Sequence, residues 1–331
     1  MRISLRTAIC VASLFAGQAL AAAAGLMASH AQPYPSKPIR FIVPFTPGGS
    51  NDVLARVVGQ KLSEAWNQPV VVENKPGAGG NIGAEVAARS QADGYTFLIA
   101  ADNILSINQS LYDKLPFDPQ KDFAPVTLLG TLPILLVVNP SLSANSIKDL
   151  IALGKLSASG LTYASGGNGT PQHLSGELFK FMAGLKMTHV PYRGNAPAVT
   201  DLLAGQVQML LSPINSVLPH VKTGRLRALG VASKARLFYL PDVPTIAEAG
   251  VPGFYNEIWI ALVAPAGTPS EIIDKMQREV VAILGLADVR EKLTAQGIEP
   301  AASSPDELRT RIGNEAARWA RILKEGGIRA E

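Results

Sequence analysis

Short apolar runs rich in β-branched residues alternate along this chain with segments in which apolar residues recur every three or four positions. Alternation of this kind is typical of βα units with a largely parallel sheet. The first unit shows it clearly, because residues 39–43 predict a strand and residues 51–66 predict a helix after a turn at 44–50. We therefore expect an α/β fold.

The same pattern predicts two lobes. Residues 126–138 form a long apolar run that predicts one long strand, or two, leaving the first set of units. A second set follows, and the chain is expected to return to the first set near residue 257. This organisation predicts lobe 1 at residues 32–133 plus 257–331 and lobe 2 at residues 134–256. The remaining expected elements are strands at 70–72, 96–100, 161–164, 226–231 and 259–263, and helices at 82–89, 146–153, 171–183 and from about 195.

Three helix starts carry capping signals. Thr170 followed by a proline predicts the start of helix 171–183, on which Leu174, Leu178, Phe181 and Met182 are expected to line one face. The segments 268–271 and 304–307 each combine a Thr or Ser, a Pro and a Glu at capping-box spacing. Two helices are therefore expected to close the chain.

The N-terminus is typical of a secretory signal peptide. Arg2 and Arg6 precede an uncharged stretch at residues 7–29, and residues 29–31 offer small residues at the positions required for cleavage. Cleavage before Gln32, and hence a periplasmic protein, is the interpretation we favour. A cut after Ala21 fits the same rule, and an uncleaved membrane anchor is the alternative, because the stretch is long enough to span a bilayer.

Composition narrows the class of protein further. Cys10 is the chain's single cysteine, so a mature chain of residues 32–331 has no disulfide. Thirty Lys and Arg residues, two of them in the leader, stand against 26 Asp and Glu residues, without a basic run suited to a phosphate backbone. We expect a soluble monomer that does not bind nucleic acid.

Two glycine-rich loops are the candidate binding elements. Each is expected between a strand and a helix start, where open α/β sheets bind ligands and free N–H groups favour an anion. Each could instead be an ordinary βα turn, but together, one in each lobe, they could clamp a carboxylate. The first loop consists of Phe45, Thr46, Pro47, Gly48 and Gly49, and the second of Ser165, Gly166, Gly167, Asn168, Gly169 and Thr170.

Motifs for catalysis and cofactors do not match. The glycines at 77–83 lack the dinucleotide-binding spacing, and Ser165 lacks the glycine that a nucleophile elbow needs two residues before it. His173, His189 and His220 are not spaced as metal ligands. His173, beside the second loop, either approaches a ligand or only packs and caps. We expect no cofactor, no metal and no catalytic site.

The chain resembles the Bug (TctC-like) family of solute receptors of tripartite tricarboxylate transporters. The resemblance runs in order along almost the whole mature chain. Its motifs are YPSKPIR at residues 34–40, PGG at 47–49, ENKPGAGGNIG at 73–83, DGYT at 93–96, HVPYRG at 189–194, PHV at 219–221, PDVPT at 241–245 and PAGTP at 265–269.

The resemblance implies a periplasmic binding protein of the Venus-flytrap type, with two α/β lobes joined by hinge strands. It implies that a small organic carboxylate (mono-, di- or amino-carboxylate) is captured between the lobes and delivered to the permease subunits of a tripartite transporter. A sensing partner of a signalling receptor is the alternative. Carried over by position, Tyr192, Arg193, Gly194 and Pro197 would line the second lobe's side of the cleft. Asp201 would touch the ligand or, as we favour, fix the loops.

Two segments depart from the family pattern. Asp102 stands where relatives usually have small residues; it could face the ligand and select an ammonium or hydroxyl group, or cap a helix. Residues 211–215 read LSPIN, where the family more often has an aromatic residue followed by Asp-Asn. That region can face the distal end of the ligand, so the ligand of a relative does not transfer to this chain.

Overall fold

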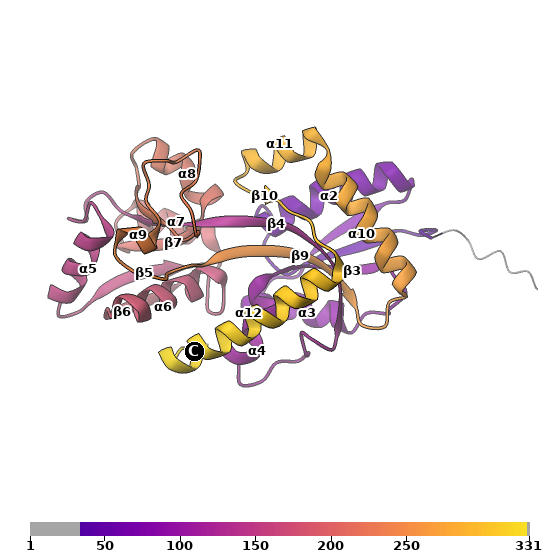
Figure 1. The fold of residues 1–331 in the computed structure, drawn as a ribbon, viewed down its shortest axis with the longest axis horizontal. Coiled ribbons are helices and arrows are strands. Elements are labelled where there is room, and N and C mark those ends of the chain that lie inside the picture. Colours follow the sequence, from indigo (N-terminus) through magenta and orange to yellow (C-terminus); the bar gives the residue numbers. More distant parts are fainter. Residues whose placement is uncertain (1–33, 330–331) are drawn as a thin grey trace, which may run out of the picture. The chain divides into compact units, whose positions relative to one another are not determined.

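The computed structural model describes residues 34–329 (Figure 1). The predicted leader, both possible cleavage sites and Cys10 lie outside the described residues. Within residues 34–329, no helix combines the length and the apolar character that crossing a bilayer requires. All of the helices and strands belong to one compact unit that begins at Lys37.

The described residues form a mixed sheet, so the predicted α/β fold is confirmed. Its main path runs in the order β2-β1-β3-β9-β4-β7-β5-β6, and β8 and β10 pair with β4 outside that path. The strands are β1 Ile39–Val43, β2 Val70–Asn74, β3 Thr96–Ala101, β4 Phe123–Val138, β5 Leu161–Ser165, β6 Met187–Pro191, β7 Met209–Pro213, β8 Arg227–Val231, β9 Glu257–Pro265 and β10 Glu299–Pro300.

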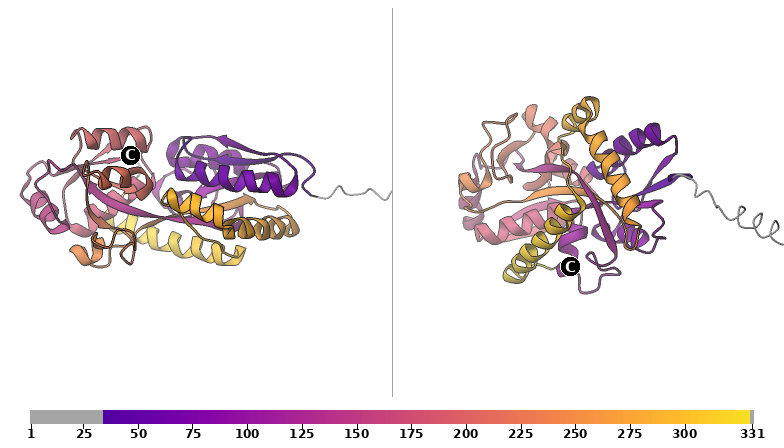
Figure 2. Two further views of the ribbon diagram at one scale, coloured as in Figure 1. Left: turned by 90° about the horizontal axis from the view of Figure 1, so that it is seen from above. Right: turned by 45° about the vertical axis from the view of Figure 1, so that its right-hand side comes forward.

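The longest strand, β4, belongs to both halves of this sheet. Its residues 123–133 pair antiparallel with β9, whereas residues 134–138 pair antiparallel with β7. The strands β1, β2 and β3 lie parallel to one another on one side, and β5 lies parallel to β6 and β7 on the other. Figures 1 and 2 show β4 and β9 running between two groups of helices.

Helices flank the sheet in both halves. The first half carries α2 to α4 and α10 to α12, and the second carries α5 to α9. Their bounds, with those of the short turns, are α2 Ser50–Trp66, η1 Ala78–Gly80, α3 Asn81–Ala88, η2 Asn103–Ile107, α4 Asn108–Leu111, α5 Ile147–Leu156, α6 Pro171–Ala183, α7 Asn195–Leu203, α8 Ile214–Lys222, α9 Ile246–Ala249, α10 Ser270–Gly285, α11 Ala287–Ala295 and α12 Pro305–Gly326.

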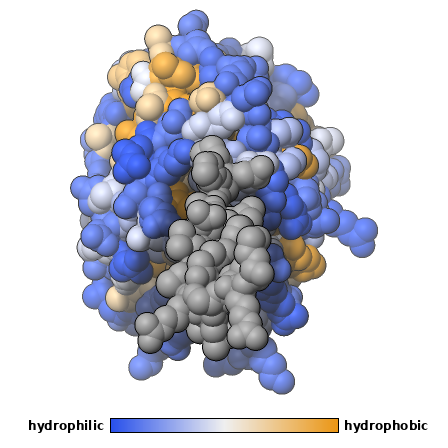
Figure 3. Space-filling view, turned by 90° about the vertical axis from the view of Figure 1, so that its right-hand side faces the viewer, coloured by the Kyte–Doolittle hydropathy of each residue, from blue (hydrophilic) through white to orange (hydrophobic). Residues whose placement is uncertain are grey.

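Burial follows the predicted pattern over most of the chain. On α2, Leu54, Val58 and Leu62 are fully buried, as the helical spacing predicts. Outside its grey atoms, the face in Figure 3 is mainly hydrophilic. On α6, Leu174 and Leu178 are buried, whereas Phe181 and Met182 are 42% and 37% exposed. These two residues lie on the last turn before the helix ends, beyond the part that packs on the sheet.

The capping signals give a mixed result. Thr170 caps α6, and Ser304 forms the predicted capping box with Glu307 at the start of α12. The prediction for Thr268 is wrong, because α10 begins at Ser270 and the Thr268 hydroxyl donates to the carbonyl of Pro265, 2.8 Å away. The threonine therefore stabilises the turn before the helix and does not cap it.

Candidate functional site

Four helices begin at one small cavity, which we call the central cavity. They are α2, α6, α7 and α8, and the cavity between their N-termini has a volume of about 120 Å³. Its lining residues are Phe45, Thr46, Gly49, Ser50, Asn51, Ala101, Leu132, Gly166, Thr170, Pro171, Gln172, Gly194, Asn195, Pro213, Ser216, Ile258 and Ile260. Both predicted glycine loops contribute to this lining.

A buried carboxylate, that of Asp52, helps to fix the first loop. Gly48, at φ 84°, donates its backbone N–H to Asp52 Oδ2 at 3.0 Å, and Asn74 donates to the carbonyl of Phe45 at 3.1 Å. Burial alone would raise the pKa of Asp52, but the hydrogen bonds from Arg56, Gly48 and Asn74 hold that pKa below its usual value. These hydrogen bonds therefore hold the shape of the first loop.

Two stacked histidines hold the second loop. The rings of His173 and His189 lie 4.2 Å apart, and Gly169 donates its N–H to His173 Nδ1 at 3.1 Å. His189 Nε2 lies 2.6 Å from Ser165 Oγ, which accepts the N–H of Gly167 at 3.0 Å. Burial and neighbouring His173 and Lys180 lower the pKa of His189 to about 3, so its ring is neutral at ordinary pH. His173 thus packs and caps within the loop.

Hydrogen bonds near the cavity join the two halves of the sheet. Asn103 Nδ2 donates to the carbonyl of Gly79 at 2.7 Å and to that of Gly169 at 3.0 Å. Asn215 Nδ2 donates to Ser50 Oγ at 3.1 Å. Gly79 has φ 62°, and a Cβ there would lie 2.7 Å from the hydroxyl of Tyr112. Gly79, in the segment 77–80 whose spacing does not match a dinucleotide-binding site, therefore allows the chain to lie close to Tyr112.

Two larger spaces adjoin the central cavity and share lining residues with it. One, of about 890 Å³, includes Pro47, Gly48 and Arg225 in its lining and is called the Arg225 chamber. The other, of about 730 Å³, includes Tyr112 and is called the Tyr112 chamber; the predicted residues Gly167, Asn168 and Tyr192 line it. Most of the predicted loop residues therefore lie on the central cavity or beside it.

Five predicted site residues line none of these three spaces: Asp102, Ser165, Gly169, Pro197 and Asp201. Ser165 and Gly169 make the internal loop bonds described above. Asp201 accepts a 2.7 Å hydrogen bond from the hydroxyl of Tyr192, so it fixes a residue that lines the Tyr112 chamber.

Asp102 lies at the start of η2 and is only 3% exposed. Its Oδ1 has no hydrogen-bond partner among residues 34–329, and its side chain does not cap the helix. Burial, together with Glu315, raises the pKa of Asp102 to about 8, and Arg311 opposes this shift. Asp102 is therefore placed against α12 and not in the lining of the cavity.

Sequence reasoning missed several lining residues. Four of them lie in the first turns of the converging helices: Asn51, Gln172, Asn195 and Ser216. The predicted starts of α2, α6 and α7 could have identified the first three of these as candidate binding residues. Ala101, Leu132, Ile258 and Ile260 come from β3, β4 and β9 and form an apolar floor. In the described part of the chain, no group of His, Cys, Asp and Glu is placed to hold a metal ion.

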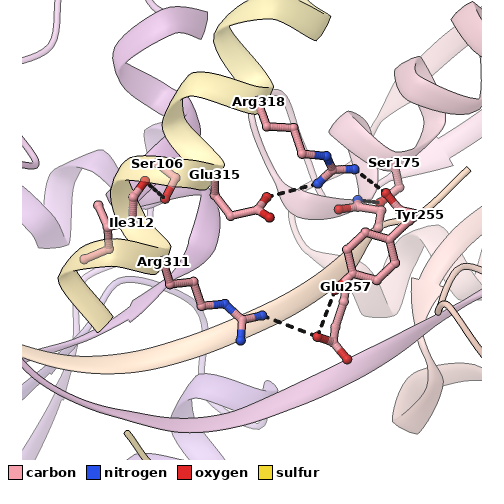
Figure 4. A network of polar contacts seen from close by, with 9 residues as sticks. Ser106, Ser175, Tyr255, Glu257, Arg311, Ile312, Glu315 and Arg318 are labelled. Atoms are coloured by element: carbon pink, nitrogen blue, oxygen red, sulfur yellow. Dashed lines mark hydrogen bonds and ion pairs between the residues drawn. The ribbon is translucent and has the colours of Figure 1, made fainter. Parts of the chain in front are cut away.

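A polar network ties α12 to the segment that enters β9 (Figure 4). Arg318 hydrogen-bonds the carbonyl of Tyr255 and pairs with Glu315 at 3.0 Å, and Arg311 lies 3.4 Å from Glu257. The next residue along the segment, Asn256, donates to Ser175 Oγ on α6 at 2.7 Å. The strand that this segment enters, β9, contributes Ile258 and Ile260 to the cavity lining.

Comparisons with known proteins find solute receptors of one family. Residues 54–328 match the sequence model of a protein family described as the tripartite tricarboxylate transporter family receptor. Protein BugT of Bordetella pertussis is 41% identical over 93% of this chain and 95% of its own. The structure of R. palustris Rpa4515 with adipate has a TM-score of 0.85 at 39% identity, covering 89% of this chain and 99% of that one. The periplasmic binding protein BugD has a TM-score of 0.83 at 32% identity, covering 90% and 100%. These likenesses confirm the predicted fold class.

Proposed function

Because this chain belongs to the family of tripartite tricarboxylate transporter receptors, we propose that it is a periplasmic solute receptor and not an enzyme. It captures a small organic carboxylate between two lobes and delivers it to the permease subunits of a tripartite transporter. The leader-like N-terminus supports the periplasmic location. The related structure with adipate supports the class of ligand.

The observation that carries the proposal is the convergence of four helix N-termini on the central cavity. The first N–H groups of a helix have no partner within it, and the helix dipole adds about half a positive charge there. Such an arrangement binds an anion without arginine or lysine. A carboxylate placed between the loops would exchange its hydration shell for these donors.

The two lobes of the proposal are residues 32–133 plus 257–331 and residues 134–256. The exchange of pairing partners along β4, from β9 up to residue 133 to β7 from residue 134, supports this division. The first loop belongs to one lobe and the second to the other, so a ligand bridging them favours the arrangement in which the lobes meet. Release requires the lobes to separate.

Glycine substitutions test the two-loop site. Gly48 has φ 84°, and a Cβ added there would meet no atom within 4 Å; Gly184, at the end of α6, has φ 63° with equally open surroundings. Valine at either position strains the backbone similarly, so Gly184→Val is a matched control for Gly48→Val. Calorimetric titration with a panel of carboxylates should show at least a tenfold loss of affinity for Gly48→Val and little for the control. Equal affinities in both variants would refute the two-loop site.

Delivery needs its own experiment. Deleting the gene should abolish uptake of the carboxylate that the purified protein binds, and restoring the wild-type gene should restore it. Uptake that continues unchanged in the deletion strain would contradict the transport role, even if binding is confirmed.

A further inference from the structure

We infer that the central cavity selects a small monocarboxylate with an uncharged, apolar tail, and that Gln172 contacts its carboxylate. The inference deepens the proposed function and rests on it. It narrows the ligand from carboxylates in general to those that carry a single charge.

The lining of the central cavity carries no charged side chain among the described residues. Its polar side chains are all neutral hydroxyls and amides, and they lie at the helix N-termini and on the first loop. The apolar members form the rest of the wall and are Phe45, Ala101, Leu132, Pro171, Pro213, Ile258 and Ile260. A ligand here therefore meets neutral donors from the helix N-termini and hydrocarbon from β3, β4 and β9.

The apolar floor is continuous. Leu132 on β4 is the direct antiparallel partner of Ile258 on β9, and Ala101 on β3 is the partner of Ile260 on β9. All four are at most 5% exposed, so a carbon chain lying on them is removed from water. A charged group on the same floor would lose its hydration without gaining a partner.

Positive side chains lie only in the lining of the adjoining spaces, as far as the described residues show. Arg225 belongs to the Arg225 chamber, and Arg193 to the Tyr112 chamber. The central cavity of about 120 Å³ is slightly smaller than the roughly 150 Å³ of an engineered cavity that accepts benzene. It therefore suits a ligand of about six non-hydrogen atoms, and neither arginine is among the residues that line it.

Gln172 supplies the contact that would otherwise need a cation. It occupies the first turn of α6 and is 9% exposed, and no hydrogen bond joins its side-chain amide to another residue in the range 34–329. Asn51, by contrast, donates to the carbonyl of Ile99 at 2.9 Å, and Asn195 donates to Ser212 Oγ at 3.2 Å. The Gln172 amide is thus available to donate to a carboxylate held at the helix N-termini.

Three ligands with the same four-carbon chain test the charge of the tail. Butyrate, succinate and 4-aminobutyrate end in a methyl, a carboxylate and an ammonium group. Calorimetric titration of the purified wild-type protein should give a dissociation constant for butyrate at least tenfold lower than for the other two. Succinate or 4-aminobutyrate binding as tightly as butyrate would overturn the inference and leave the proposed function standing. If none of the three binds, and longer mono- and dicarboxylates do not bind either, the proposed function fails as well.

Substitutions of Gln172 test its contact. Gln172→Glu places a negative charge in the cavity and should weaken butyrate binding at least 100-fold, whereas Gln172→Leu should weaken it less. Gln120→Glu makes the same change on an exposed turn outside the three spaces and serves as the control. Wild-type affinity in a folded Gln172→Glu protein, judged by its circular dichroism, would overturn the role of Gln172.

Discussion

Replacing Asp102 by asparagine is expected to stabilise the protein, and to do so increasingly as the pH rises. The side chain is buried, and the pKa of its carboxyl is raised from 3.8 to about 8. Between these two values the folded protein keeps a proton that the unfolded chain releases. Raising the pH therefore favours unfolding, so the stability present below pH 4 is lost progressively up to about pH 8.

The size of the effect follows from this linkage. Each pH unit between the two pKa values costs the wild type about 1.4 kcal/mol of free energy of unfolding. An asparagine side chain has nearly the same shape as that of aspartate and stays neutral, so this loss disappears in Asp102→Asn. The variant's stability relative to wild type should thus grow by about 3 kcal/mol between pH 5 and pH 7.

Urea unfolding at pH 5, 6 and 7 measures this difference. Because the variant is compared with wild type at each pH, contributions of other titrating groups cancel. Asp113→Asn, at an exposed aspartate, controls for the change in net charge. A difference between Asp102→Asn and wild type that stays constant from pH 5 to pH 7 would refute the buried, protonated state of Asp102.

Three further substitutions test contacts around the site. Arg318→Ala removes the hydrogen bond to the carbonyl of Tyr255 and should lower the unfolding free energy by about 1–3 kcal/mol; an unchanged urea midpoint would contradict this. His189→Phe keeps a ring in the stack but loses the bond to the second loop, and should weaken carboxylate binding about tenfold by calorimetry. Because the pKa of His189 is lowered from 6.5 to about 3, its contribution to stability is complete above pH 6.5 and falls as the pH drops; His189→Phe should lack this acid loss in urea titrations. Gly79→Ala would bring a Cβ to 2.7 Å from the Tyr112 hydroxyl and should weaken binding, whereas equal affinity would show that the contact yields easily.

Features that depend on neighbouring residues could be predicted from the sequence. The strand, the glycine-rich turn and the helix start that make up each binding loop follow one another directly along the chain. The cap at Thr170 and the capping box at Ser304 are equally local. Even so, Thr268 shows that a local capping signal can mislead, because its hydroxyl donates to a carbonyl of the preceding turn and does not cap α10.

Features that depend on distant residues could not be predicted in the same way. The apolar floor needs Leu132 and Ile258, which are far apart in the sequence, to become strand partners. Asp102 was recognisable as unusual, but its surroundings are set by Glu315 and Arg311 on the last helix of the chain. The sequence therefore could not show that this carboxylate lies under α12 and away from the cavity.

The second departure from the family pattern, at residues 211–215, does lie at the central cavity. Within residues 211–215, Pro213 lines the central cavity, Ser212 exchanges hydrogen bonds with Asn195, and Asn215 donates to Ser50 across the two halves. A change of residue type in this segment therefore alters the cavity wall itself. This is the physical reason why adipate, the ligand in a structure 39% identical to this chain, does not by itself identify the ligand here. Neutral, mainly apolar side chains at these positions favour a ligand whose far end is uncharged.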